Sequence, residues 1–424
     1  MVEIDPSAYI VFPDTTRRKH LVTQDGEAWA CSCDLAKELA DERCEHVWAV
    51  VFTLKPPQTG EVVLELIGTV DDRSDSWRAY TEAQKAEGRL FSEFLSALLS
   101  TVDEPGRPEG RAGAPRLPLR EGLFCTIKKV YSGFSCRRYY SEMEADASAG
   151  LINRLPNWSV ASRFLSRPEI TPLLLDLVTF SATPLMEVER GGTIAIDSTG
   201  FSAHWFGGYF LEAHDVDRDH DWVKAHLAIG ARTHIVTAAV VNEHGGDAPE
   251  FPGLLHTTVD AGFAPSTVVA DRGYLSHRNY AVAAKMGLKA YIPFKSNSDP
   301  TPRGVRMWRD MYHQFALHDG QFDDPYHQRS QVESTNSALK RKLGEPLLSK
   351  GVVARRNEVL CKILGYNITI LIAEVFRSGI DPIELFRKGN APAEDARSPR
   401  GLEEPAIAGC ENIGAAVKES TPSE

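Results

Sequence analysis

The sequence predicts an α/β fold in which a mixed β-sheet is flanked by helices, and three observations lead to this prediction. Between residues 192 and 344, three strand-like segments follow one another and then alternate with helical segments, which is typical of a mixed sheet covered by helices. Between residues 123 and 189, apolar residues recur at intervals of three and four, which predicts a helical region before the sheet. Strand-like segments and clustered cysteines near the N-terminus indicate a small separate module.

The expected elements divide the chain into five parts. Residues 8–56 form the small module, which ends at two consecutive prolines that cannot continue a helix. Residues 57–122 form a connecting segment, with a strand at 62–68, a helix at 77–99 and a linker rich in proline, glycine and charge. Residues 123–190 are the helical region, and residues 191–388 are the α/β region, which a long helix at 355–377 closes. The polar, proline-rich residues 389–424 are expected to be disordered.

The composition is that of a soluble globular protein with an acidic charge balance. Of the 424 residues, 42% are hydrophobic and 25% are charged. We identify no apolar run long enough to cross a bilayer and no signal peptide, so we expect a cytoplasmic (prokaryotic, nucleoid-associated) protein without a membrane partner. The formal net charge of −11 argues against a uniformly basic, nucleic-acid-binding surface, but a local basic face is sufficient for DNA binding.

Two acidic residues follow apolar strands of the α/β region. Asp197 comes directly after TIAI, and Asp271 comes directly after TVVA. An ionised carboxylate at the end of a buried strand needs compensation from a metal, a cation or a cap, and strand ends of α/β sheets are where active sites gather. Either acid alone could instead begin a turn, because DSTG and DRG are both turn-compatible sequences.

A third acid, Glu333, lies in a predicted helix that begins at Asp324 and ends at Gly344. At about 100° per residue, one edge of this helix carries a polar row that is separate from the apolar stripe. The row consists of Tyr326, Arg329, Glu333 and Lys340. The helix can therefore bury one edge and present the row to an adjoining cleft. The alternative is a solvated face on which Glu333 pairs with neighbouring cations.

Three motifs together resemble the family-4 insertion-sequence transposases. The spacing Y-x2-R-x3-E-x6-K matches the signature of that family, at Tyr326, Arg329, Glu333 and Lys340. The segments IDSTG and ADRGY resemble its two aspartate motifs, and DxGY is also typical of the related family-5 group. The resemblance covers approximately residues 120–380.

The resemblance implies a DDE-type DNA transposase with an RNase H-like core. In such a core Asp197, Asp271 and Glu333 would hold two Mg²⁺ or Mn²⁺ ions, which prefer hard oxygen ligands. Two ions of this kind stabilise the attacking and leaving oxygens of an in-line displacement. The implied reaction is strand cleavage at the element ends, followed by transfer of the 3′-OH into target DNA. The implied partners are double-stranded terminal inverted repeats, target DNA and a second copy of the chain.

The resemblance also assigns DNA-binding residues near the acids. In the family, the residues at the positions of Tyr326, Arg329 and Lys340 contact DNA phosphates. Neighbouring cations extend this row into a basic patch despite the acidic total, namely Arg341, Lys342, Lys350, Arg355 and Arg356. An isolated charge run of this kind is usually a solvated face. Trp308 could hold a flipped base by stacking, but a buried core tryptophan fits its sequence context as well.

The N-terminal module contains a CxC-x10-CxH pattern. Thiolates and an imidazole with this spacing favour a closed tetrahedral zinc site, here formed by Cys31, Cys33, Cys44 and His46. The pattern resembles the SWIM zinc finger, which binds DNA or proteins. The alternative is a set of unliganded cytosolic cysteines.

Three functions therefore compete at the level of sequence. The first is an active, homodimeric DNA transposase. The second is a DNA- or protein-binding factor that uses a transposase scaffold without cutting, and the third is an RNase H-like nuclease without strand transfer. The three acids and the complete Tyr-Arg-Glu-Lys row favour the first function.

Overall fold

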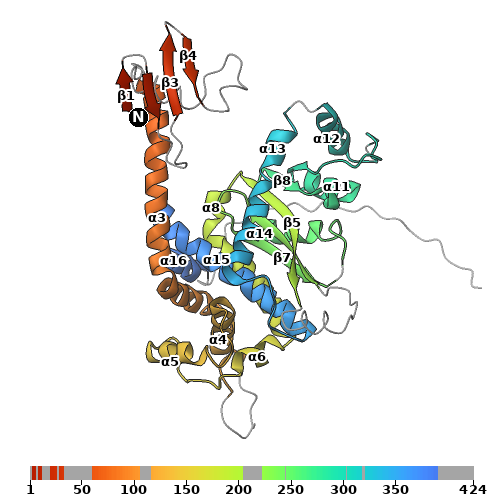
Figure 1. Cartoon of the computed structure of the whole chain (residues 1–424). Helices are drawn as coiled ribbons and strands as arrows, with labels where there is room; N and C mark the ends of the chain where they lie inside the picture. Colours follow the sequence, from red (N-terminus) through yellow and green to blue (C-terminus); the bar gives the residue numbers. More distant parts are fainter. Residues whose placement is uncertain are drawn as a thin grey trace, which may run out of the picture.

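The computed structural model describes residues 2–5, 8–11, 20–25, 28–32, 60–105, 116–203, 222–243, 245–301, 303–317 and 320–389. At the N-terminus, four short strands form an antiparallel sheet in the order β1-β2-β3-β4 (Figure 1). The strands are β1 (Val2–Asp5), β2 (Ala8–Val11), β3 (His20–Asp25) and β4 (Ala28–Cys31). The strand-like segments expected near the N-terminus are therefore confirmed, since YIV lies in β2 and HLVT in β3.

A 40-residue helix, α3 (Gly60–Leu99), follows this sheet and runs from it to the rest of the molecule (Figure 1). The strand predicted at residues 62–68 is wrong, because these residues lie inside α3. A short apolar run cannot be assigned to strand or helix from periodicity alone. The helix expected at 77–99 is confirmed as the second half of α3.

The helical region consists of α4 (Leu119–Ser132), α5 (Tyr140–Ser148), α6 (Val160–Leu165), α7 (Ile170–Ala182) and α8 (Met186–Glu189). It packs tightly against α3, since the ring of Phe91 on α3 stacks on Tyr131 of α4 with 3.6 Å between centroids. Gly122 on α4 allows an equally close approach, because a Cβ at this position would lie 1.9 Å from the Phe164 ring of α6. The predicted helical region is confirmed.

The central sheet has five strands in the order β7-β6-β5-β8-β9. The antiparallel strands β5 (Thr193–Ser202), β6 (Trp222–Gly230) and β7 (Val236–Asn242) form one half of it. The strands β8 (Thr267–Ala270) and β9 (Lys289–Tyr291) join parallel to β5 through the connecting helices α10 (Phe251–Asp260) and α11 (His277–Lys285). The predicted mixed sheet flanked by helices is therefore confirmed.

The chain then forms α12 (Arg306–Leu317), α13 (Asp323–His327), α14 (Ser330–Leu343), α15 (Val352–Ser378) and α16 (Pro382–Gly389). Helix α15 matches the long helix expected at 355–377 and contacts α3, α4, α7 and β7. It is long and apolar enough to cross a membrane, with a mean hydropathy of 1.8, contrary to our reading of the sequence. Because 78% of that apolar window is buried inside the fold, α15 is a core helix.

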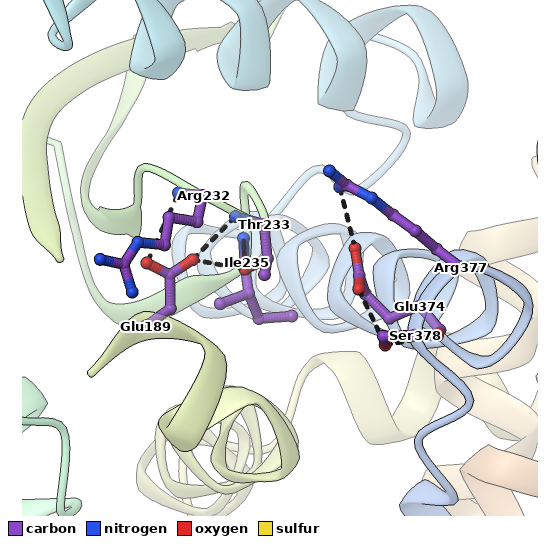
Figure 2. Close-up of polar contacts among 7 residues, drawn as sticks. All are labelled: Glu189, Arg232, Thr233, Ile235, Glu374, Arg377 and Ser378. Carbon is purple, nitrogen blue, oxygen red and sulfur yellow. Dashed lines mark hydrogen bonds and ion pairs between the residues drawn. The ribbon is translucent and has the colours of Figure 1, made fainter. Parts of the chain in front are cut away.

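A buried carboxylate holds the turn between β6 and β7. Glu189 is 2% exposed, and its Oε1 accepts hydrogen bonds from the backbone N and the hydroxyl of Thr233, at 2.7 and 2.8 Å (Figure 2). Gly230 permits this contact, because a Cβ there would lie 2.4 Å from the Glu189 carboxyl carbon. In the same view Glu374 of α15 accepts hydrogen bonds from Arg377 and Ser378 (Figure 2). The hydrogen bonds of Glu189, at the end of α8, therefore connect the β6–β7 turn to the helical region.

Candidate active site

The two aspartates lie next to each other on neighbouring parallel strands. Asp271 directly follows β8 as predicted, but Asp197 lies in the middle of β5, so the strand end and the alternative turn expected at Asp197 are wrong. Ile196 of β5 pairs with Ala270 of β8, so the next residue of each strand, Asp197 and Asp271, extends from the same edge. Asp197 Oδ1 accepts a hydrogen bond of 2.8 Å from the backbone N of Ser198. Asp271 caps the short turn Arg272–Tyr274, since its Oδ1 accepts a hydrogen bond of 2.6 Å from the backbone N of Arg272. The turn alternative therefore describes Asp271 correctly, but it does not account for the proximity of the two acids.

Asp197 lies in an environment that disfavours its charge. Burial, with smaller contributions from the nearby carboxylates of Asp271 and Glu333, raises the pKa of Asp197 from its ordinary value to about 6. The Ser198 backbone hydrogen bond and the guanidinium of Arg329 oppose these effects and lower it. The three predicted acids are thus close enough to interact electrostatically, which is the grouping that the sequence predicted.

Arg329 connects two of these acids. Its Nη2 lies 2.6 Å from Glu333 Oε1, and its Nη1 lies 3.6 Å from Asp197 Oδ2. The side chain of Glu333 is 58% exposed, whereas that of Asp197 is only 16% exposed. Glu333 thus lies at the open side of the site, and the guanidinium supplies positive charge between it and the sheet.

The predicted single helix around Glu333 is in fact two helices. Helix α13 ends at His327 and α14 begins at Ser330, with a tight turn between them. In this turn the backbone N of Arg329 donates to Tyr326 O at 2.9 Å, three residues back rather than four. The physical reason is that residues 327–331 include no apolar side chain to pack on the core. The apolar stripe Val332, Leu339 and Leu343 is confirmed as buried.

The break distributes the Tyr-Arg-Glu-Lys row over two elements. Tyr326 belongs to α13, where its half-buried ring packs on Phe322 and lies 5.8 Å from the Arg329 guanidinium. Lys340 on α14 pairs with Glu345 at 3.1 Å. Lys342 pairs with Glu87 of α3 at 2.5 Å, and Arg341 is exposed. Arg329 therefore lies beside Asp197 and links it to Glu333, whereas Lys342 connects α14 to α3.

Sequence reasoning missed a polar network behind the aspartates, on the other face of the sheet. Tyr274 is fully buried, and its hydroxyl lies 3.0 Å from Nδ1 of the equally buried His226. Lys224 Nζ donates to Asp247 Oδ1 at 2.6 Å, and the same oxygen lies 3.6 Å from His226 Nδ1. Burial raises the pKa of Tyr274 far above its ordinary value and lowers the pKa of His226, so both side chains are neutral at pH 7.

This network gives a structural reason for the last two letters of ADRGY. A Cβ at Gly273 would lie 2.6 Å from Asp247 Oδ2, so only glycine leaves room for that carboxylate. Tyr274 occupies the space beneath β5 and β6, where Ser198 pairs with His226. The available signal was the alternation of Lys224 and His226 along β6, which places both side chains on one face. Their partner Asp247 comes from a distant loop, which spacing alone does not reveal.

The donor chemistry of the site fits a divalent metal ion. Asp197, Asp271 and Glu333 offer hard carboxylate oxygens, and their mutual repulsion is relieved by added positive charge. Within the ranges that the structure describes, however, no three His, Cys, Asp or Glu side chains are close enough to hold a metal in the present arrangement. In this arrangement the guanidinium of Arg329 supplies positive charge beside Asp197 and Glu333.

Two other sequence predictions concern residues outside this site. Trp308 is 5% exposed, stacks on His277 with 3.6 Å between ring centroids, and donates from Nε1 to Asp299 O at 2.8 Å. The core alternative for Trp308 is therefore confirmed. Of the predicted zinc ligands, Cys31 ends β4, whereas Cys33, Cys44 and His46 lie outside the described residues. The tail at 390–424 also lies outside them.

Comparison with known protein families agrees with this geometry. Residues 190–368 match the model of the transposase DDE domain. The matched segment extends from the end of α8 into α15 and includes Asp197, Asp271 and Glu333. The match supports a DDE-type transposase, and domains of this family generally use divalent metal ions. The five-stranded mixed sheet flanked by helices is consistent with the RNase H-like fold of such a domain.

Proposed function

We propose that this protein is a DNA transposase that cuts at the ends of its element and joins the free 3′-OH to target DNA. The observation that carries this proposal is the position of Asp197 and Asp271 on adjacent parallel strands, with Glu333 connected to Asp197 through Arg329. All of these residues belong to the segment that matches the transposase DDE domain. The signature Tyr-Arg-Glu-Lys row supports the further assignment to a family-4-like enzyme.

Asp197, Asp271 and Glu333 are the proposed catalytic residues and would hold two Mg²⁺ or Mn²⁺ ions. Such ions supply Lewis-acid stabilisation of the attacking and leaving oxygens in phosphoryl transfer. The protein's own residues orient these ligands. The Ser198 and Arg272 backbone amides fix one oxygen of each aspartate, and the buried Tyr274 supports β5 from behind. The partly exposed Glu333 completes the site from the opposite side.

Arg329 would have two successive partners under this proposal. In the present arrangement it neutralises Asp197 and Glu333. A DNA phosphate offers the same bidentate geometry to a guanidinium, so substrate binding would draw Arg329 away from the acids. Tyr326, Lys340 and Arg341 would contact further phosphates along α13 and α14, whereas Lys342 would have to leave Glu87 to do so.

The test incubates the full-length protein with Mg²⁺ or Mn²⁺ and duplex DNA that carries candidate terminal inverted repeats. Nicked, cut and joined products are separated on a gel. We expect Asp197→Asn, Asp271→Asn and Glu333→Gln each to reduce product formation by roughly a thousandfold, about 4 kcal/mol in the activation barrier. Asp260→Asn, an exposed acid at the end of α10, is the matched control and should retain wild-type activity.

The same experiment separates the competing functions. If the wild type binds its ends but forms no metal-dependent product, the protein is a binding factor on a transposase scaffold. If it forms nicked or cut products but no joined ones, it is a nuclease without strand transfer. Joined products that require all three acids support the transposase, and the stoichiometry of the paired-end complex tests the proposed homodimer.

We further propose that Cys31, Cys33, Cys44 and His46 bind one structural zinc ion in a SWIM-like module. The short strands β1 to β4 precede the remaining ligands, as the resemblance implies. Elemental analysis of the purified protein should give one zinc ion per chain for the wild type and for Cys136→Ser, and none for Cys44→Ser. Zinc retained in Cys44→Ser would exclude this site. A loss of end binding in the same variant would assign the module to DNA recognition.

A further inference from the structure

A cleft in the helical region has four arginines in its wall. It measures 560 Å³ and lies between the residues that precede α4 and helix α6. The arginines are Arg116, Arg154, Arg163 and Arg167, and all four are exposed. Glu169 is the one acidic residue among those that line the cleft. Within the described residues, no salt bridge or side-chain hydrogen bond involves any of these four guanidinium groups.

The charge of this cleft differs from that of the whole chain. The protein carries a formal net charge of −11, yet residues 116–169 contain nine lysines and arginines against five acids. The other cations of this segment are largely engaged: Lys128 pairs with Asp146, and Arg120 donates to Val102 O at 2.5 Å. Four guanidinium groups around one cleft, with no acidic partner among the residues that the structure describes, repel one another, so a polyanion in the cleft is electrostatically favoured.

The floor of the cleft is rigid. Arg167 lies 3.8 Å from the centroid of the Phe164 ring, and Phe164 is held against Gly122 of α4. The backbone on either side is also fixed, because Asn357 of α15 donates from Nδ2 to Leu165 O at 2.9 Å and to Arg167 O at 3.1 Å. A ligand of this cleft therefore meets a fixed backbone and ring, and the free-energy cost of ordering is confined to the exposed arginine side chains.

The start of α15, which carries two cations of the predicted basic patch, is hydrogen-bonded to the backbone at the end of α6 beside the cleft. Asn357 belongs to the first turns of α15, next in the chain to Arg355 and Arg356, and it donates to the backbone carbonyls of Leu165 and Arg167. Lys340 and Arg341 lie on the same chain segment, towards Glu333. The Arg356 Nε is buried and has no hydrogen-bond partner in the described structure. Cations are therefore present on α14, at the start of α15 and around the cleft, and α15 packs on both α14 and α6.

We infer that this arginine cleft binds the sugar–phosphate backbone of duplex DNA that extends from the proposed active site. The inference deepens the proposed function and rests on it for the identity of the polyanion. Arginine suits this ligand because its planar group donates two parallel hydrogen bonds to a phosphate. The cleft presents guanidinium groups and no set of alternating donors and acceptors, so it positions DNA and does not read its sequence.

The test measures duplex DNA binding by fluorescence anisotropy in EDTA, with the full chain and a series of KCl concentrations. The variant Arg116→Gln/Arg154→Gln/Arg163→Gln leaves the packed Arg167 in place. We expect its affinity to fall by roughly tenfold or more, equally on element ends and on unrelated duplexes. Its slope of log affinity against log salt should decrease by about three, one for each lost phosphate contact.

Two further variants make this result specific. Lys85→Gln/Arg89→Gln/Arg190→Gln removes the same charge from exposed, already paired sites and should retain the wild-type slope. Arg116→Lys/Arg154→Lys/Arg163→Lys keeps the charges and should retain the slope while it loses affinity a few-fold, because the bidentate geometry is lost. Thermal melting of all variants confirms folding.

The inference is overturned if the glutamine triple variant binds DNA like the wild type or no worse than the charge-matched control. It is also overturned if this variant loses as much affinity for a poly-glutamate peptide as for DNA, because the cleft then binds acidic protein. Failure of the proposed function looks different. In that case the glutamine triple variant still binds DNA more weakly than the wild type in EDTA, but the wild type forms no metal-dependent product.

Discussion

Gly273 and Tyr274 connect the proposed catalytic acid Asp271 to a buried network. Asp271 caps the turn that these residues form, Gly273 makes room for the Asp247 carboxylate, and the Tyr274 hydroxyl meets His226 beneath β5. The motif ADRGY thus has one residue that faces the proposed substrate and two that hold its backbone in place. At the scale of single residues, the orientation of Asp271 depends on contacts made on the far side of the sheet.

Gly273→Ala tests this dependence. The added methyl group would overlap Asp247 Oδ2. Lys224 Nζ donates to Oδ1 of the same carboxylate at 2.6 Å and holds it in place. Either Asp247 or the turn after Asp271 must therefore shift. We expect a loss of about 1–2 kcal/mol in the free energy of unfolding and a fall in product formation of at least about tenfold. Chemical denaturation and the cleavage assay measure the two effects.

Two further variants distinguish the steric overlap with Asp247 from a general effect of replacing glycine with alanine. Gly88→Ala, on α3 with no atom within 4 Å of the added Cβ, should stabilise the protein by about 0.5–1 kcal/mol. The double variant Asp247→Ala/Gly273→Ala should be no less active than Asp247→Ala alone, because the overlapping oxygen is gone. A double variant as impaired as the sum of the two single changes would contradict this explanation.

At the scale of elements, the two ends of the helix that carries Glu333 differ in how far the sequence predicts them. Its start could not be predicted correctly, because the break before Ser330 arises from three-residue hydrogen bonds in a polar segment that periodicity does not resolve. Its end at Gly344 was predictable, since glycine adopts the positive φ of 79° found there. What the sequence did not reveal is that Lys362, on the next helix, donates to Gly344 O and Pro346 O at 2.6 and 2.8 Å.

Lys362 predicts a pH-dependent contribution to stability. Burial lowers its pKa from 10.5 in the unfolded chain to about 8 in the folded protein. Between these two pH values the unfolded chain binds more protons than the folded one, so the contribution of Lys362 to stability increases as pH rises through this window. Below pH 8 the lysine is charged in both states, and its burial opposes folding.

Lys362→Met isolates this contribution from that of the other groups that titrate. We expect the free energy of unfolding of the wild type, minus that of the variant, to increase by on the order of 1–3 kcal/mol between pH 8 and pH 10.5. Guanidinium denaturation at several pH values measures the difference. An exposed control, Lys285→Met on α11, should show a difference that does not vary with pH. A constant difference for Lys362→Met as well would contradict the assigned cause.

At the scale of the whole molecule, the mixed sheet was predictable, whereas the order of its strands and the contacts between distant segments were not. Apolar runs and their alternation with helices predicted the mixed sheet, and the length of α15 was evident from its composition. The grouping of Asp197, Asp271 and Glu333 was predicted from the two acids that follow apolar runs, together with the resemblance. The four arginines of the cleft come from separate loops and helices, so no spacing in the sequence brings them together.

Asn367 of α15 joins the helical region to the central sheet, and its substitution tests how much these long-range contacts contribute to stability. It is fully buried, and its Nδ2 donates to Val178 O of α7 at 3.1 Å and to Val236 O of β7 at 2.8 Å. Its Oδ1 also accepts a hydrogen bond of 2.9 Å from Val236 N. Asn367→Ala leaves three buried backbone groups without this partner, so we expect a loss of at least about 3 kcal/mol in the free energy of unfolding.

The form of the unfolding transition then shows whether the helical region and the sheet behave as one unit. Because α15 packs on both, the wild type should unfold in a single transition, with the same midpoint by circular dichroism and by tryptophan fluorescence. Asn367→Ala should lower both midpoints together, and the exposed Asn297→Ala should change stability by no more than about 0.5 kcal/mol. If Asn367→Ala separated the two midpoints, the arginine cleft and the active site would belong to units that move independently, and one duplex could not engage both in a fixed register.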